Sequence, residues 1–257
     1  VGSDSGAVKT SAVADGDDFI LNGTKRYITN APEAQLFTVF ARTNPEESGA
    51  RGVSAFLVDA SLPGITLGPN NRKMGQQGAH VCDVIFENCR VPKSTIIGGP
   101  ENLNKGFATA MKTLDRGRLH ISALSVGCAN RLIEESVAFA TERTQFGQPI
   151  ADFQLIQAML ADSKAEAYAA ECMVLDAAKR RDAGERITTL ASCAKLFATE
   201  MVGRVADRAV QIHGGAGYME EYPVARFYRD VRLFRIYEGT SQIQQTVIAK
   251  GLIRELG

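Results

Sequence analysis

A glutamate next to a glycine, in the segment Tyr237–Gln242, is the residue of this sequence best suited to proton-transfer chemistry. The segment precedes a helical apolar pattern, and Thr240 or Ser241 can accept hydrogen bonds from the first turn of that helix. The positive end of the helix dipole would hold Glu238 ionised, and burial against an apolar ligand would make it a stronger base. An exposed turn glutamate is the commoner alternative, so the segment alone supports a general base only as a hypothesis.

A second candidate site is the glycine-rich stretch Gln211–Gly217, which reads QIHGGAG. Glycines let the backbone approach a phosphate-bearing ligand closely. The stretch ends a helical pattern instead of following a strand, so it is not a Rossmann fingerprint. A glycine cap at the end of a helix remains open as the simpler interpretation.

Strand patterns fill the sequence before the prolines at 92 and 100. The Asn22-Gly23 pair lies between two β-rich runs and predicts a hairpin turn. Further apolar runs at residues 36–41, 53–58 and 81–86 are separated by turn residues, a spacing typical of a compact β-barrel or sandwich. We therefore expect a β-domain over residues 1–98.

Helical patterns follow, with apolar residues recurring every three or four positions. We expect one long helix from about residue 107, a second between Asp152 and Gly184, a third over about 189–212 and a fourth over about 242–253. Four such helices predict an antiparallel four-helix bundle over residues 99–257. The fold class is therefore α+β, with the β-domain first.

Composition limits the partners of the chain. The 29 basic and 29 acidic side chains leave no net charge, which argues against binding to nucleic acid or to an anionic membrane surface. No apolar run is long enough for membrane insertion. The 5 cysteines are scattered without a C-x-x-C pair, so we expect neither a metal site nor a disulfide framework. A soluble intracellular protein is expected, and the start at Val1 suggests a fragment of a longer chain.

Six separated segments together resemble the acyl-CoA dehydrogenase family, and the resemblance covers essentially the whole chain. The segments occur in the order found in the family and are Gly2–Asp4, Arg26–Asn30, Asp115–Arg118, Glu142–Gly147, Gln211–Gly217 and Tyr237–Gln242. The resemblance implies the family's middle β-domain and C-terminal helical domain, with its N-terminal helical domain absent from this sequence.

The resemblance also assigns roles to individual residues. It implies FAD as the cofactor, contacted by Tyr27, Thr29, Arg143, Phe146, Gln154, Gln211, Gly214, Gly215, Thr240 and Gln242. It implies an acyl-CoA substrate, lined by Ser3, Asp115, Arg118, Tyr237 and Gly239. Tyr27 and Thr29 stand two apart in an expected strand, which would put them on one face. Without the resemblance, Asp115 and Arg118 would equally be a surface pair one helical turn apart.

The implied reaction is the dehydrogenation of a saturated acyl-CoA to a trans-2-enoyl-CoA. Glu238 would take the α-proton while a hydride passes from the β-carbon to the flavin N5 atom. One subfamily carries its base at the position of Gly117, and a glycine cannot act there, so the base is assigned to Glu238. An acyl-CoA oxidase and, in a different class, a non-catalytic assembly subunit of the same fold remain alternatives.

The resemblance finally implies partners and a place in the cell. An electron-transfer flavoprotein would receive the electrons, as in fatty acid β-oxidation. The FAD site would cross a subunit interface through Arg143, so the expected assembly is a homotetramer, a dimer of dimers. The bacterial cytoplasm or the mitochondrial matrix would be its location.

Overall fold

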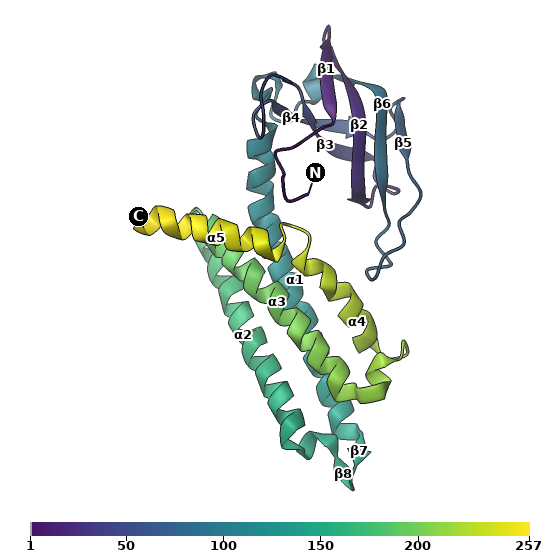
Figure 1. The fold of residues 1–257 in the computed structure, drawn as a ribbon, viewed down its shortest axis with the longest axis vertical. Helices are drawn as coiled ribbons and strands as arrows, with labels where there is room; N and C mark the ends of the chain where they lie inside the picture. Colours follow the sequence, from purple (N-terminus) through teal and green to yellow (C-terminus); the bar gives the residue numbers. More distant parts are fainter. Residues whose placement is uncertain (1) are drawn as a thin grey trace. The chain divides into compact units, whose positions relative to one another are not determined.

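The computed structural model describes residues 2–257, and these divide into two compact units, the first ending at Thr113 and the second spanning Leu114–Gly257 (Figure 1). The first unit is built from strands and the second from helices. The predicted change from strands to helices is therefore confirmed. None of the helices in the described residues combines the length and hydropathy that a membrane span requires.

A six-stranded mixed sheet forms the first unit, in the order β4-β3-β1-β2-β6-β5. Its strands are β1 (Ser11–Asp15), β2 (Asp18–Thr29), β3 (Leu36–Arg42), β4 (Val53–Asp59), β5 (Ile65–Leu67) and β6 (Val81–Pro92). All neighbours pair antiparallel except β1 and β3, which meet in parallel at Ser11 and Arg42. Strands β4 and β5 are the two edges of this sheet, so the described residues do not form the closed barrel that was one expectation.

The core of this unit lies under the alternating apolar positions of the strands. Leu21, Phe56 and Phe86 are among its largest fully buried side chains, and the rings of Phe19 and Phe56 meet edge to face at 5.4 Å. Burial of such aromatic pairs stabilises the sheet both by the area removed from water and by ring geometry.

The predicted hairpin turn at Asn22-Gly23 was wrong. Strand β2 continues through both residues, and the turn that joins β1 to β2 lies at Gly16 and Asp17. Gly23 instead marks a shift in the register between β2 and β6, with φ at +135°. Because β2 pairs with a neighbour on each side, its extended path outweighs the local turn preference of the Asn-Gly pair.

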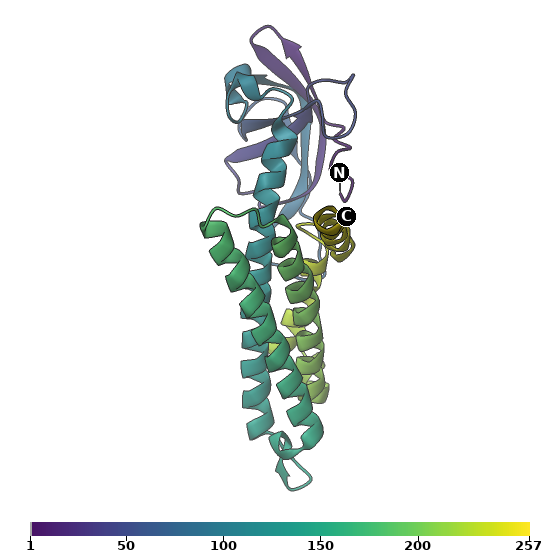
Figure 2. The same ribbon diagram turned by 90° about the vertical axis from the view of Figure 1, so that its left-hand side faces the viewer.

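The second unit contains most of α1 (Gly106–Glu142), followed by α2 (Gln154–Asp182), α3 (Thr188–His213), α4 (Pro223–Val231) and α5 (Ser241–Leu256). Short elements connect them: β7 (Thr144–Gln145), β8 (Gln148–Pro149), and the 3-10 helices η3 (Ile150–Asp152), η4 (Gly214–Tyr218) and η5 (Arg232–Arg235). Two further 3-10 turns, η1 (Lys93–Thr95) and η2 (Pro100–Asn102), precede α1. Figure 2 shows α2 and α3 side by side along most of their length.

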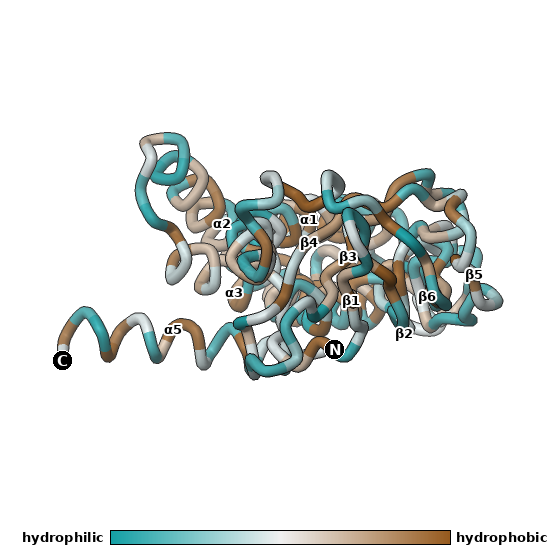
Figure 3. Tube along the Cα trace, turned by 90° about the horizontal axis from the view of Figure 1, so that it is seen from above, coloured by the Kyte–Doolittle hydropathy of each residue, from teal (hydrophilic) through white to brown (hydrophobic). Residues whose placement is uncertain are grey.

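The helical core differs from the predicted bundle. Its buried side chains come from α1, α2, α3, the short helix α4 and the 3-10 helix η5, which contributes Phe234. The short helix α4 was not predicted from the sequence. Helix α5, the expected fourth member, buries only Ser241, Gln244 and Gly251. It leaves Leu252 and Ile253 exposed, and apolar and polar residues alternate along it in Figure 3. The sequence pattern of α5 resembles that of a bundle helix, but α4 occupies the place next to the core.

Candidate active site

Glu238 lies on the irregular connection between η5 and α5, as the sequence predicted. Its φ is +53°, and the φ of the following Gly239 is +85°. Two consecutive left-handed residues are uncommon, and a glutamate in this conformation is strained unless the surroundings hold it. The connection therefore projects Glu238 by a backbone path that an ordinary helix start would not take.

The carboxylate of Glu238 lies against α1 at Gly117. Its Oε2 atom is buried and has no hydrogen-bond partner. A Cβ atom added at Gly117 would lie 2.3 Å from that oxygen, closer than real atoms approach. The glycine on α1 therefore provides the space in which the carboxylate rests. A buried oxygen without a partner is available to accept a proton from a ligand.

Burial raises the pKa of Glu238 above its ordinary value of 4.5. The positive charges of Arg118, Lys195 and His120 act in the opposite direction and lower this pKa, but desolvation is the larger effect. A carboxylate of raised pKa is a stronger base than one in water. The site thus combines a desolvated base with nearby cations that favour its ionised form.

Asp115 and Arg118 form an ion pair in which Arg118 is buried and Asp115 is partly exposed. The N–O distance is 2.8 Å, Arg118 is 6% exposed, and Thr188 at the start of α3 donates to the second carboxylate oxygen of Asp115 at 2.8 Å. The Nε atom of Arg118 is buried without a partner. Arg118 is therefore buried and held by Asp115, and its charge acts on the Glu238 carboxylate.

Lys195 and Gln244, which the sequence analysis did not single out, hold the backbone next to Glu238. Each is 0% exposed. The ammonium group of Lys195 donates to the Gly239 carbonyl at 2.7 Å, and the Gln244 amide donates to the carbonyls of Glu238 and Gly239, both at 3.0 Å. In the sequence, Lys195 falls at helical spacing from Ala191 and Ala198, on the apolar face of α3. A charged residue at such a position could have indicated a buried lysine with a polar partner.

The start of α5 is fixed by hydrogen bonds that involve the side chains of Thr240 and Ser241. Thr240 caps the helix, because its side-chain oxygen accepts from the Ile243 amide at 3.2 Å. Ser241 donates to Glu200 of α3 at 2.5 Å. Gln242 is exposed, whereas Tyr237 is half-buried. The predicted cap at Thr240 is confirmed, and the predicted site residues on this connection do lie together.

A second group of predicted residues lies at the other end of α3. Phe139 near the end of α1 stacks on His213 at the end of α3, with ring centroids 4.3 Å apart, and its carbonyl accepts from the Arg143 amide at 2.9 Å. The loop with Arg143 and the Gly214 turn therefore share this end of the unit. The predicted residues found at this end are Arg143, Phe146, Gln154, Gln211, Gly214 and Gly215, and all of them are exposed.

Phe146 is the most unusual residue of this group. It is 94% exposed, and together with Gly147 it forms the two-residue turn of the β7–β8 hairpin, with φ values of +53° and +85°. A phenylalanine that is both strained and solvated is uncommon, and it leaves an apolar ring on the surface of this hairpin. At Gly214, an added Cβ would meet nothing within 4 Å, so the backbone there is open to close approach.

The two groups are far apart within one chain. From Lys195 to His213 the helix α3 advances by about 27 Å, at about 1.5 Å per residue. Residues at the two ends therefore do not form one compact site within a single chain. Spacing in the sequence did not reveal this separation.

The predicted residues of the first unit are Ser3, Tyr27 and Thr29, and all three are exposed. Tyr27 has φ at +57°, and the register of β2 and β6 shifts between Lys25 and Ile28. The Tyr27 amide donates to Asp83 on β6 at 3.1 Å. This bulge breaks the regular alternation from which a common face for Tyr27 and Thr29 was expected, so that face remains a prediction.

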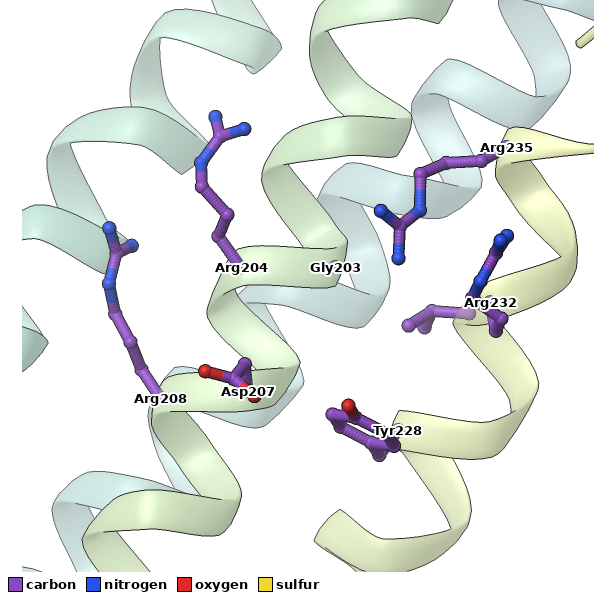
Figure 4. Close-up of a pocket in the computed structure, with 8 residues that line it drawn as sticks. Gly203, Arg204, Asp207, Arg208, Tyr228, Arg232 and Arg235 are labelled. Atoms are coloured by element: carbon purple, nitrogen blue, oxygen red, sulfur yellow. The ribbon is translucent and has the colours of Figure 1, made fainter. Parts of the chain in front are cut away.

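An arginine-rich pocket on the second unit contains none of the predicted site residues. Figure 4 shows Arg204 and Arg208 on α3, with Arg232 and Arg235 on η5. Carboxylates neutralise three of these four: Glu166 pairs with Arg204 and Arg208, and Glu200 pairs with Arg235 at 3.2 Å. Glu200 also accepts a hydrogen bond from Ser241. Through Arg235 and Ser241, Glu200 therefore holds both ends of the connection that carries Glu238.

Comparison with known proteins follows the same division of the chain. Residues 1–89 match the acyl-CoA dehydrogenase middle domain, and residues 104–253 match the acyl-CoA dehydrogenase C-terminal domain. The chain is 46% identical over 254 residues to a protein named caffeyl-CoA reductase-Etf complex subunit CarC from Acetobacterium woodii, covering 99% of this chain and 66% of that protein.

Two further similarities agree. The chain is 46% identical over 253 residues to a 3-(aryl)acrylate reductase of Clostridium sporogenes, covering 98% of this chain and 66% of that protein. The solved structure of butyryl-CoA dehydrogenase from Megasphaera elsdenii superposes with a TM-score of 0.95 at 38% identity, over 99% of this chain and 66% of that one. The chain thus spans just under two thirds of these relatives, and it belongs to the acyl-CoA dehydrogenase family.

Proposed function

We propose that this protein is an FAD-dependent acyl-CoA dehydrogenase that converts a saturated acyl-CoA into a trans-2-enoyl-CoA, with Glu238 as the general base. The observation that carries the proposal is the Glu238 carboxylate, buried without a partner in the space left by Gly117. Membership of the family supports the same role. Tyr237, Gly239, Asp115, Arg118 and Ser3 would line the thioester arm of the substrate.

The chain's own groups then divide the work. The Glu238 carboxylate accepts the α-proton, and its raised pKa makes it a stronger base for that step. The backbone N–H of Glu238 donates to the thioester carbonyl, which acidifies the α-carbon. Arg118 and Lys195 supply positive charge that keeps the carboxylate ionised before the transfer. Exclusion of water by the substrate's apolar chain strengthens these interactions further.

FAD is the cofactor that the exposed residues suit. The solvated ring of Phe146 and the open backbone at Gly214 leave room for a planar or phosphate-bearing group. Arg143 is exposed beside them and offers a planar cation for phosphate oxygens. When bound, FAD would supply the acceptor for the hydride that leaves the substrate. Gln154, Gln211 and Gly215 would hold it at this end of the helical unit, and Tyr27, Thr29, Thr240 and Gln242 would hold it elsewhere.

Because the two groups of residues are about 27 Å apart along α3, we propose that one FAD site takes residues from two copies of the chain. A homotetramer arranged as a dimer of dimers would provide such shared sites. An electron-transfer flavoprotein is the proposed electron acceptor, supported by the relative named for an Etf complex. We further propose that the functional domains are residues 1–98 and 99–257.

A second candidate is the reverse reaction, the reduction of a 2-enoyl or aryl-acryloyl thioester. Two relatives, each 46% identical to this chain over the aligned residues, are named caffeyl-CoA reductase-Etf complex subunit CarC and 3-(aryl)acrylate reductase. The same site supports it, because a protonated Glu238 with a raised pKa can return a proton to the α-carbon. Residue roles would be unchanged, and only the direction would differ.

The test uses the holoenzyme without oxygen. Saturated acyl-CoAs from short to long and branched are mixed with the oxidised protein, and aryl-acryloyl-CoAs with the reduced protein, while flavin absorbance is recorded. Bleaching by a saturated thioester supports the dehydrogenase, and recovery of colour with an acryloyl thioester alone supports the reductase. Rapid reoxidation of the reduced protein by oxygen would favour the oxidase alternative.

Glu238→Gln separates chemistry from binding. The amide keeps the size of the side chain but cannot accept the α-proton, so flavin bleaching should slow by roughly 100- to 10,000-fold while FAD stays bound. Glu171→Gln, which changes an exposed carboxylate on α2, should react like the wild type. A Glu238→Gln protein that bleaches at the wild-type rate would reject Glu238 as the base.

A further inference from the structure

The connection that carries Glu238 is held by α3 through polar groups along its length. At the two ends of the connection, Glu200 accepts from Arg235 at 3.2 Å and from Ser241 at 2.5 Å. In the middle, Lys195 donates to the Gly239 carbonyl at 2.7 Å. These contacts join residues more than 30 positions apart, so they fix a strained loop to a rigid helix.

Gly239 is the point on which the contacts converge. Its carbonyl accepts from Lys195 and from Gln244 at once. An added Cβ at Gly239 would lie 2.6 Å from the Gln244 amide nitrogen, so the glutamine side chain is packed directly on this glycine. Both donors are fully buried, and a lost hydrogen bond there would leave a buried polar group unsatisfied.

Burying the charge of a lysine costs free energy, so the presence of Lys195 on an apolar helix face needs an explanation. Lys195 is 0% exposed, and its pKa falls from 10.5 to about 8 because burial removes water from the ammonium group. The carboxylates of Glu238 and Glu200 face it and raise that pKa, while Arg118 lowers it. The ammonium therefore remains charged at neutral pH, next to the backbone of the proposed base.

We infer that Lys195 is a positioning residue for the proposed base: it holds the left-handed Glu238-Gly239 turn through the Gly239 carbonyl, with Gln244 as its neutral partner. The inference rests on the proposed function of Glu238. Lys195 acts in two ways, by fixing the backbone and by placing a positive charge near the carboxylate. Gln244 acts only in the first way, which allows the two effects to be separated.

The test compares Lys195→Met and Gln244→Met in the holoenzyme. Methionine keeps an unbranched apolar chain but removes the donor. Both variants should lower kcat by roughly 10- to 100-fold with a smaller change in KM, because a misplaced base affects the chemical step. Only Lys195→Met should also move the acid side of the pH–rate profile to higher pH, since it removes a charge that lowers the pKa of Glu238.

Thr199→Val is the matched control, because Thr199 is equally buried on α3 and its hydroxyl bonds only within the helix, to the Lys195 carbonyl at 2.8 Å. It should leave kcat and the pH profile unchanged. Thermal unfolding and FAD content, measured for all three variants, identify any that fails to fold. Wild-type kcat and an unmoved acid limb in folded Lys195→Met would overturn the inference.

Hydrogen exchange makes the inference independent of the proposed reaction. Amides in the peptide covering residues 236–244 should exchange faster in Lys195→Met than in the wild type or in Thr199→Val. If the wild type reduces no flavin with any thioester, the proposed function fails, while faster exchange still supports the positioning role. Unchanged exchange in Lys195→Met would reject the positioning role even in an active enzyme.

Discussion

Glu238 owes its proposed reactivity to two opposing influences on one carboxylate. Burial raises its pKa above 4.5, and the charges of Arg118, Lys195 and His120 lower it. Burial has the larger effect, so the pKa of Glu238 is raised. The protonated form therefore persists to higher pH than in an ordinary glutamate. A base must be ionised to act, so activity should be lost on the acid side of that raised pKa.

For the holoenzyme, we therefore expect kcat/KM to rise with pH through an apparent pKa above 4.5 and then to level off. Arg118→Gln removes the largest of the lowering charges, so its acid limb should lie at still higher pH. Stopped-flow flavin reduction across the pH range measures both profiles. An acid limb at or below pH 4.5 would contradict the raised pKa of Glu238. An unmoved limb in Arg118→Gln would show that the Arg118 charge does not lower this pKa.

Helix α1 has a glycine at residue 117, and the absence of a side chain there makes room for the Glu238 carboxylate. An alanine there would place its Cβ 2.3 Å from the Glu238 Oε2 atom, so the carboxylate would have to move. An alanine in a helix interior is also favoured over glycine by about 0.5–1 kcal/mol. That gain offsets part of the steric cost, which for overpacking is about 1–3 kcal/mol.

Gly117→Ala should therefore reduce the rate of flavin reduction by roughly 10- to 100-fold, with a loss of stability smaller than the overpacking cost alone. Gly127→Ala is the control on the same helix, because an added Cβ at that position meets nothing within 4 Å. It should keep full activity and gain about 0.5–1 kcal/mol in the free energy of unfolding. Equal activity of the two variants would show that the contact with Glu238 does not matter.

At the scale of the whole molecule, the exposed loop that joins the end of α1 to the start of α2 is the proposed contact between copies of the chain. Phe146 is 94% exposed and strained, and Arg143 lies beside it in the same loop. A ligand that binds across copies of the chain stabilises the assembled state, because it binds that state and not the separated one. FAD content and assembly should then change together.

Arg143→Ala should lower the FAD content of the purified protein and shift its mass by light scattering towards smaller assemblies. Added FAD should restore the mass if the cofactor links the copies. Lys164→Ala, which removes another exposed cation on α2, should change neither property. Full FAD content and unchanged mass in Arg143→Ala would mean that Arg143 is only a surface residue.

The sequence by itself determined the order of a β-domain and a helical domain, the irregular segment that carries Glu238 and the cap at Thr240. Each of these depends on residues within a few positions of one another, where turn, cap and periodicity preferences act. Only the tertiary structure decided the outcome where a local preference conflicted with strand pairing or helix packing. Pairing on both sides of β2 turned Asn22-Gly23 into part of a strand, and α4 took the place next to the core expected for α5.

The same reason explains what the sequence missed at the site. Lys195 and Gly239 are 44 residues apart, and a single lysine among apolar helix residues does not state which carbonyl it will reach. The space at Gly117 likewise has meaning only once the Glu238 carboxylate lies against it. Contacts across such separations arise when packed helices bring distant backbone together, and they therefore exist only in the folded chain.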